Sequence, residues 1–284
     1  RTGFHRYTFP KSTTSRILFD IGHKQGESAT ITDEEVTYHP ETNEVTGWVE
    51  NYPIYATFCQ PNGKIKIFFA AKLDKKPQTI GTFIDEKIQE NSNSVKGPGC
   101  GLYLTFQTKA KEQIQMQVGL SYTSIENARN NRDAESAGKS FNDVKNAARQ
   151  TWNEMLGRIQ VEGGTPEDKT KFYTGLYHAL LGRGIANDIN GQYIRHDKTI
   201  GQIPLDKNGI PLYSHHNTDG MWGGFWNLTQ IWTLAYPEIF SSYIKSNLDF
   251  FENSGWLHDG EAAGVYTNGV QTNFQGLIIC AAYQ

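Results

Sequence analysis

The 284-residue sequence is poor in cysteine, and its three cysteines lie far apart at Cys59, Cys100 and Cys280. An odd number of widely spaced thiols without a CxxC pair argues against a disulfide framework and against a zinc knuckle. No uninterrupted apolar run approaches the ~18 residues that a membrane-spanning helix needs, so no membrane span is expected. Neither sign of charge dominates, because 27 basic residues stand beside 30 acidic ones. With a formal net charge of −3, no nucleic-acid partner is expected.

The motifs of several common enzyme classes are also absent. The sequence contains no GxSxG, HExxH, P-loop or GxGxxG pattern, so the α/β-hydrolase, zinc-protease and nucleotide-binding classes have no support. Aromatic side chains and glycine are abundant instead, with 14 Tyr, 15 Phe, 6 Trp and 28 Gly. This composition suits flat polar ligands such as sugars, and it equally suits an ordinary β-sheet core.

Both ends of the sequence lack the usual terminal signals. Arg1 opens directly into a strand-like segment with no initiator methionine or charged-then-apolar leader, so we expect this chain to contain no signal segment. The last apolar residues have helical spacing and reach Gln284 without a glycine or proline stop signal. We therefore expect the chain to be an internal fragment of a longer protein.

The first part of the chain, residues 1–125, is predicted to form β-structure. From Ile114 to Leu120 every second residue is apolar, which is typical of a strand with one buried face. Turn signals such as Pro61-Asn62-Gly63 separate the runs. Many short strands without long helices between them favour an antiparallel sandwich over β-α-β winding.

The second part of the chain is predicted to be helical. Residues 126–163 are expected to form a polar linker, over 126–139, and a connecting helix, and residues 164–284 the helical domain. Thr165 followed by proline and two acidic residues is a helix-start signal. The segment from Trp222 to Tyr236 is apolar nearly all round, which predicts a helix buried on all sides. A buried helix beside half-buried ones indicates two helix layers, as in an α/α toroid or at the centre of a bundle.

A long segment with little periodicity precedes Trp222. Loops of this length are uncommon in compact domains unless they are functional. The segment ends in a cluster that holds His215, His216, Asp219 and Trp222. Each residue has a structural alternative, because Asp219 can cap a helix and Trp222 can belong to the core. A metal shared by His215 and His216 is not expected, since adjacent side chains on an extended segment point apart.

Glycoside hydrolysis requires two carboxyl groups, one acting as acid and the other as base or nucleophile. The candidates by composition are Asp188, Asp219, Asp259 and Glu261. The pattern of the segment from His258 to Glu261 slightly favours a solvated turn over a site.

The sequence resembles bacterial glycoside hydrolase family 92, the exo-acting α-mannosidases, in several ordered stretches that extend over essentially the whole chain. These stretches are Arg1–Pro10, Ile17–Ile21, Phe172–Leu181, Tyr213–Trp222, Leu234–Glu238, Gly255–Leu257 and Gly264–Asn268.

The resemblance implies an antiparallel β-sandwich, incomplete in this chain, followed by the first helices of an (α/α)6 toroid, with the active site between them. It implies a calcium-dependent, inverting exo-α-1,2-mannosidase that acts on mannose-containing oligosaccharides or N-glycans. It also implies a periplasmic, cell-surface or secreted protein. In the family, the acid, the base and the calcium ligands lie in the later toroid, so we expect them beyond Gln284. No metal ligands are expected in this chain, and the isolated chain is expected to be inactive.

One departure from the family concerns substrate binding. The family usually has Trp-Asp at the start of this toroid helix, whereas here Gly223 follows Trp222 and Asp219 is out of register. The resemblance therefore implies Trp222 as a substrate-binding position, with Asp219 and His216 as neighbours. Two alternatives stay open, namely a non-catalytic carbohydrate-binding or scaffold protein and an α-glucoside-acting enzyme of similar architecture.

Overall fold

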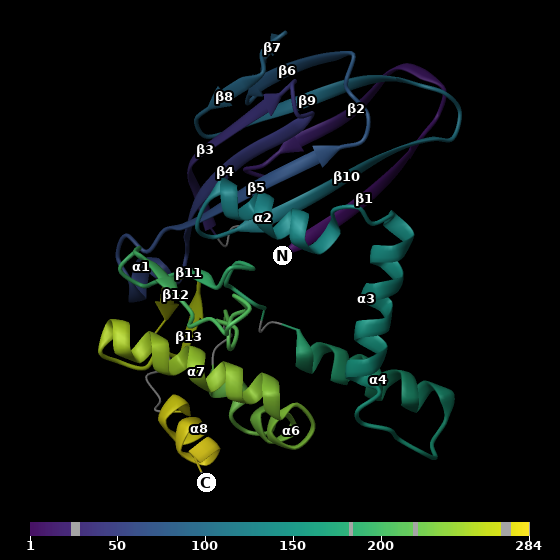
Figure 1. The fold of residues 1–284 in the computed structure, drawn as a ribbon. Helices are drawn as coiled ribbons and strands as arrows, with labels where there is room; N and C mark the ends of the chain where they lie inside the picture. The colour runs from purple at the N-terminus through teal and green to yellow at the C-terminus, as the bar shows by residue number, and fades with distance from the viewer. Residues whose placement is uncertain (24–28, 182–183, 218–220, 268–273, 284) are drawn as a thin grey trace. The chain divides into compact units, whose positions relative to one another are not determined.

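The computed structural model describes residues 1–23, 29–181, 184–217, 221–267 and 274–283. The chain divides into two compact units, Arg1–Phe141 and Asn142–Gln284. Strands dominate the first unit and helices the second (Figure 1). The predicted domains, residues 1–125, 126–163 and 164–284, describe a division by function, and they stay a prediction.

The first unit contains two antiparallel sheets. One has six strands in the order β1-β10-β5-β4-β3-β8, and the other has four in the order β2-β9-β6-β7. The elements of this unit are β1 (Thr2–Phe9), β2 (Ser12–Asp20), β3 (Ala29–His39), β4 (Glu44–Pro53), α1 (Ala56–Cys59), β5 (Ile65–Leu73), β6 (Thr79–Ile84), β7 (Lys87–Glu90), β8 (Ser94–Lys96), β9 (Cys100–Thr108), β10 (Glu112–Ser121) and α2 (Ile125–Ser136).

The core of the first unit is formed by side chains from both sheets. Leu102, Leu104 and Phe106 of β9 pack with residues such as Val45 and Phe69 of the larger sheet. Apolar side chains that alternate along the strands thus meet between the two sheets, and the predicted antiparallel sandwich is confirmed.

The alternation predicted along β10 holds over only part of the strand. Ile114 and Met116 are buried in the sandwich core, whereas Leu120 is 48% exposed. Near this end of β10, α2 covers the other face of the sheet. A Cβ atom added to Gly119 would lie 1.9 Å from the carbonyl oxygen of Ala128 in α2. The glycine therefore permits a close approach between helix and strand.

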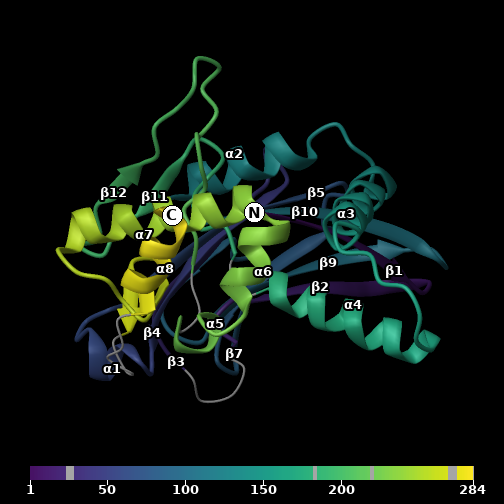
Figure 2. The ribbon, with the colours of Figure 1, turned by 90° about the horizontal axis from the view of Figure 1, so that it is seen from below.

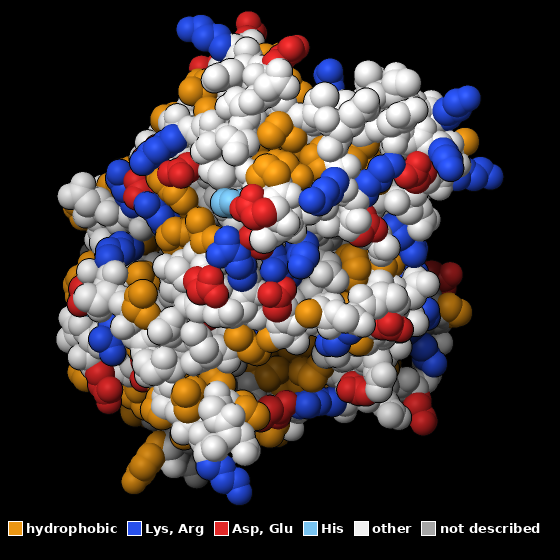
Figure 3. All heavy atoms as spheres, turned by 45° about the horizontal axis from the view of Figure 1, so that its top comes forward, with side chains coloured by type: hydrophobic (Ala, Val, Ile, Leu, Met, Phe, Trp, Pro, Cys, Tyr) orange, Lys and Arg blue, Asp and Glu red, His pale blue; other side chains and the backbone are white. Residues whose placement is uncertain are grey.

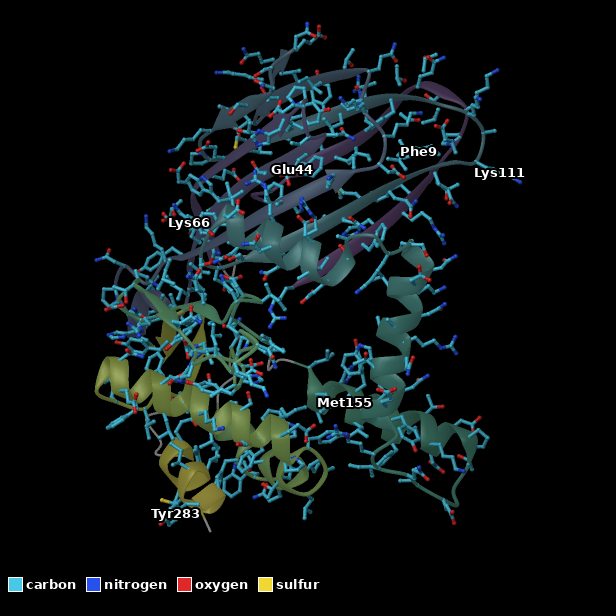
Figure 4. The ribbon with its side chains drawn as sticks, in the orientation of Figure 1. Phe9, Glu44, Lys66, Lys111, Met155 and Tyr283 are labelled. Carbon is cyan, nitrogen blue, oxygen red and sulfur yellow. The ribbon has the colours of Figure 1, made fainter. Side chains whose placement is uncertain are left out.

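The polar segment expected to be a linker is largely helical, since it contains α2. The Ser124 hydroxyl caps this helix by accepting a hydrogen bond from the Asn127 N–H at 3.0 Å. The buried face of α2 is polar, and its Arg132 forms an ion pair with the buried Glu44 of β4. Figure 4 labels Glu44 on the sheet close to α2. An apolar-periodicity criterion misses such a helix because ion pairs and hydrogen bonds replace the usual apolar stripe.

The second unit contains six helices and two short hairpins within its described residues. The elements are α3 (Phe141–Leu156), which starts at the end of the first unit, α4 (Pro166–Leu180), β11 (Gln192–Ile194), β12 (Ile200–Gln202), α5 (Met221–Gly224), α6 (Leu228–Ala235), α7 (Pro237–Ser254), β13 (Gly260–Ala262), β14 (Val265–Thr267) and α8 (Phe274–Tyr283). The helix start predicted at Thr165 is confirmed. Its hydroxyl accepts from the Asp168 N–H, and the Asp168 carboxylate accepts from the Thr165 N–H.

The helix predicted from Trp222 to Tyr236, buried on all sides, is wrong in two respects. The segment forms α5 and α6 instead, with a break that follows the glycine pair Gly223-Gly224. Leu234 is 86% exposed and Trp226 is 70% exposed. Glycine is a poor helix former, so two in succession favour the interruption. The buried side is confined to one stripe that includes Trp232.

The core of the second unit lies around α7. Trp232 of α6, Tyr243 of α7 and Ile278 of α8 are almost completely buried within it. Figures 1 and 2 both show α6 and α8 beside α7. On the surface, basic and acidic side chains are interspersed over the face drawn in Figure 3, in keeping with the nearly balanced composition.

Candidate functional site

One face of α7 binds the end of the long loop that precedes α5. This face, the α7 polar stripe, has helical spacing and consists of Ser242, Ser246 and Asp249. The N–H groups of Ser214 and His216 donate to the two serine hydroxyls at 2.8 and 2.9 Å. The Tyr213 hydroxyl donates to the aspartate carboxylate at 2.6 Å. Loop 213–217 is therefore held on a rigid helix.

The same loop also pairs with the chain segment that follows α4. The Ala186 N–H donates to the His215 carbonyl at 2.8 Å, and the Asn217 N–H donates to the Gly184 carbonyl at 2.9 Å. The Asn187 side chain accepts from the His215 N–H at 2.9 Å. This extended conformation directs the two histidine rings to different partners, as adjacent positions on an extended chain predict.

His216 lines a cavity of about 370 Å³ in the second unit. The lining residues are Thr151, Trp152, Met155, Leu180, Ile185, Ser214, His216, Trp232, Glu238, Ile239 and Ser242. Met155, labelled in Figure 4, contributes from α3. Small-ligand sites commonly measure about 300–1,000 Å³ and combine apolar walls with a few polar groups. Imidazole, hydroxyl and carboxylate groups beside two indoles give this cavity the means to hold a small hydroxylated ligand.

A second group of polar side chains is fully buried near the cavity wall. Glu261 directs one carboxylate oxygen to His215 Nε2 at 3.2 Å and the other to His258 Nε2 at 3.6 Å. We call these three residues the His–Glu cluster, and all of them are buried. The solvated-turn interpretation of the segment from His258 to Glu261 is therefore wrong. The turn is instead enclosed by His215 of loop 213–217 and by α7, whose Phe250 packs edge-on against His258.

Opposing effects set the charge state of the His–Glu cluster. Burial by itself favours the neutral acid at Glu261, but the two imidazoles and the hydrogen bonds from His215 and Gly264 outweigh it. They hold the pKa of Glu261 below its ordinary value. Burial lowers the pKa of His258 to about 4, although Glu261 opposes the shift. Near neutral pH the cluster therefore contains an ionised Glu261 and an uncharged His258.

The connectivity from Ser246 to His215 to Glu261 is that of a serine–histidine–acid triad. Ser246 Oγ lies 3.2 Å from His215 Nδ1, and His215 Nε2 lies 3.2 Å from the carboxylate. However, Ser246 is only 1% exposed and does not line the cavity, and its hydroxyl already accepts from the His216 N–H. A nucleophile must reach its substrate, so the geometry supports a structural role for this serine.

Asp249 is a functional candidate that the sequence analysis missed. Burial raises its pKa, and the hydrogen bond from Tyr213 opposes that shift only in part. Burial together with Asp249 raises the pKa of Tyr213 as well. The missed signal was the spacing 242, 246 and 249, which aligns polar side chains on one face of a helix. Their partners lie far away in the sequence, so spacing alone does not identify what they bind.

Of the three predicted substrate-binding residues, only His216 has a described side chain. His216 is buried at the cavity wall, where its Nε2 lies 3.2 Å from Ser242 Oγ. Asp219 lies outside the described residues, and for Trp222 only the backbone within α5 is described. Substrate binding by all three residues stays a prediction.

The remaining carboxylate candidates are all buried. Asp188, Asp259 and Glu261 are each less than 5% exposed. Asp259 and Glu261 both interact electrostatically with His258, and Glu261 is engaged on both of its oxygens. Glu261 is therefore a buried partner of two imidazoles and not an accessible acid or base.

The described residues do not fit a calcium site. Calcium takes about 6–8 oxygen ligands, mainly carboxylates, carbonyls and waters. In the described ranges no three His, Cys, Asp or Glu side chains are arranged to hold a metal ion. In addition, no helix in these ranges has both the length and the hydropathy of a membrane-spanning segment.

Comparisons with known protein families identify the class of protein. Residues 1–121 match the glycosyl hydrolase family 92 N-terminal domain, and residues 127–284 match the glycosyl hydrolase family 92 catalytic domain. The two matched segments follow one another and leave only a few residues unmatched. They place the chain among the glycosyl hydrolases. It belongs to glycosyl hydrolase family 92.

Solved structures of the same family share this fold. The family GH92 α-mannosidase BT3965 from Bacteroides thetaiotaomicron is 21% identical, with a TM-score of 0.84 over 99% of this chain and 36% of that one. The inverting mannosidase BT2199 from Bacteroides thetaiotaomicron VPI-5482 is 22% identical, with a TM-score of 0.81 over 100% of this chain and 36% of that one. The family GH92 glycosyl hydrolase ccman5 is 22% identical, with a TM-score of 0.78 over 99% and 36%.

This chain thus spans about a third of the length of the solved structures it matches. No curated protein matches it at a significant level. The expected fold class, an antiparallel β-sandwich followed by the first helices of an (α/α)6 toroid, is confirmed by the family matches and the shared fold.

Proposed function

We propose that the chain is part of a glycosidase that hydrolyses α-linked mannose residues of glycans with inversion at the anomeric carbon. The observation that supports this most directly is the consecutive match of both family 92 domains along the chain. The similar solved structures include one described as an inverting mannosidase and one in complex with mannoimidazole. These names support mannose as the sugar recognised here.

Within this proposal, the described residues bind and position the sugar and do not transfer protons. An inverting reaction needs an acid and a base about 6.5–9.5 Å apart, with room for a water molecule between them. Glu261 is engaged by two imidazoles, and the Asp249 carboxylate accepts from Tyr213. We assign the acid, the base and the calcium ligands to parts of the full-length protein outside the described residues. The extracytoplasmic location implied by the resemblance belongs to the same proposal.

The sugar contacts proposed for this chain involve His216, Trp222 and Asp219. The His216 imidazole can exchange hydrogen bonds with sugar hydroxyls at the cavity wall, and an indole such as Trp222 offers a flat apolar surface to a pyranose ring. Gly223 stands where the resemblance implies an aspartate. That difference favours a carbohydrate-binding protein without hydrolytic activity as the second candidate function.

The test is an activity assay of the full-length protein that contains this chain. We expect release of mannose from an aryl α-mannoside, with the β-anomer formed first in the NMR spectrum and with loss of activity in a calcium chelator. His216→Ala should raise KM, whereas His178→Ala, at an exposed position on α4, should leave the kinetics unchanged. Cleavage of α-glucosides but not of α-mannosides would contradict mannose as the substrate sugar and support an α-glucoside-acting enzyme instead. Calorimetric binding of mannose oligosaccharides without turnover would support the carbohydrate-binding function instead.

A further inference from the structure

We propose that Glu261 and His258 are positioning residues, which fasten the β13–β14 hairpin against loop 213–217 at neutral pH and release the hairpin in acid, while α7 continues to anchor the loop. Glu261 lies in β13 and His258 just before it, so the proposed latch joins the β13–β14 hairpin to the loop that contains His216. The existence of the latch does not depend on the proposed function. Its effect on glycan binding rests on that function.

Two contacts join the hairpin to the loop. The Glu261 carboxylate lies 3.2 Å from His215 Nε2, and the Ala263 N–H donates to the Asn217 side-chain oxygen at 2.9 Å. These residues flank His216 in the sequence, so the hairpin contacts the loop on both sides of the cavity-lining residue. Opening of the hairpin removes both contacts at once.

The His215 ring is held on both of its nitrogens. The Ser246 hydroxyl accepts from the His216 N–H at 2.9 Å, and it lies 3.2 Å from His215 Nδ1. An ionised carboxylate only accepts hydrogen bonds, so His215 Nε2 donates to Glu261. The closed latch is therefore a charge-assisted hydrogen bond in a fully buried site.

His258 makes the closed state sensitive to acid. Among the described residues neither of its ring nitrogens has a hydrogen-bond partner, and its Nε2 lies 3.6 Å from Glu261. The titratable groups that act on it are Glu261 and Asp259 from its own segment and His215 from the loop. Helix α7 faces it with the uncharged ring of Phe250. Two carboxylates favour the protonated form, but enclosure outweighs them.

The sign of the pH effect follows from these shifts. Burial lowers the pKa of His258 from 6.5 to about 4, so the open hairpin binds a proton more readily than the closed one. Below pH 6.5, acid therefore favours opening, until the pH reaches about 4. The lowered pKa of Glu261 acts in the same direction, because its stabilisation of the closed state is lost as the pH falls. For His258 alone, the linkage relation gives an opening constant roughly 20-fold larger at pH 5 than at pH 7.

Hydrogen exchange measured by mass spectrometry tests the latch without any ligand. We expect the opening constants of peptides from 258–267, corrected for the intrinsic pH dependence of exchange, to rise about 20-fold between pH 7 and pH 5. His258→Gln should remove most of this rise. His178→Gln replaces an exposed histidine on α4 and should retain it. Glu261→Gln should weaken protection already at pH 7, and Glu261→Asp should restore part of it.

Two results would overturn the latch. One is equal pH dependence of exchange in His258→Gln and the unchanged protein. The other is an NMR resonance of His258 that titrates near its ordinary pKa while the hairpin stays protected, a measurement that needs no variant to fold. The experiments distinguish failure of the latch from failure of the proposed function. Acid opening without hydrolysis or binding of mannosides would leave the latch in place, whereas hydrolysis with a pH-independent hairpin would remove only the latch.

Discussion

Gly264 lies where the β13–β14 hairpin closely approaches the segment between β11 and β12. Its replacement by alanine is therefore expected to destabilise the second unit. Its φ angle is +71°, in the left-handed region. A Cβ atom there would lie 2.4 Å from the carbonyl oxygen of Arg195 and 3.1 Å from the His196 nitrogen. Both atoms are backbone, so the clash is relieved only if the β13–β14 hairpin moves away from the segment between β11 and β12.

The magnitude follows from two separate costs. A left-handed conformation costs a residue with a Cβ atom about 1–2 kcal/mol, and overpacking of a filled site adds about 1–3 kcal/mol. Gly209→Ala is the matched control, because Gly209 has a φ of +78° but no atom within 4 Å of an added Cβ. The conformational cost is common to both variants. We therefore expect Gly264→Ala to be less stable than Gly209→Ala by about 1–3 kcal/mol.

Urea denaturation followed by tryptophan fluorescence measures this difference. Trp48 is the only tryptophan outside the second unit, so the signal reports mainly on that unit. Equal free energies of unfolding for Gly264→Ala and Gly209→Ala would refute the close contact between the hairpins. A loss confined to Gly264→Ala, with faster hydrogen exchange in β13–β14, would agree with it.

Three further outcomes are expected. Glu44→Gln removes the carboxylate that pairs with the buried Arg132, which should cost about 3–5 kcal/mol in thermal or urea unfolding of the first unit. Thr165→Ala removes the cap of α4 and should cost about 1 kcal/mol, measured as a lower urea midpoint. Burial raises the pKa of Cys100 to about 12, so iodoacetamide should label the exposed Cys280 at pH 8 and spare Cys100 until the protein unfolds.

The local features of the fold were predictable from the sequence because their causes are local. The start of α4 at Thr165 depends on residues within one helical turn, and the buried side of β10 at Ile114 and Met116 depends on simple alternation. Helix α2 was missed since its buried face is polar and is stabilised by an ion pair with Glu44, distant in the sequence. Neighbouring residues do not encode such a partner.

The candidate site was predictable only in outline. The histidine pair and the acidic segment near Glu261 stood out by composition, but their contact depends on chain segments 46 residues apart. Without that contact, a solvated turn was the favoured interpretation of the segment from His258 to Glu261. Burial therefore decides between the two interpretations, and it depends on tertiary packing that single-segment patterns do not contain.

Helix α7 contacts different parts of the second unit with two different faces, which limits the insertions and deletions that the helix can accept. Phe240 and Tyr243 face the apolar interior, while the α7 polar stripe anchors loop 213–217. Each added or deleted residue would rotate the rest of the helix by about 100° and misalign both faces together. Exchanges of side chains that preserve the helical register are therefore tolerable along α7, whereas insertions and deletions within the helix are not.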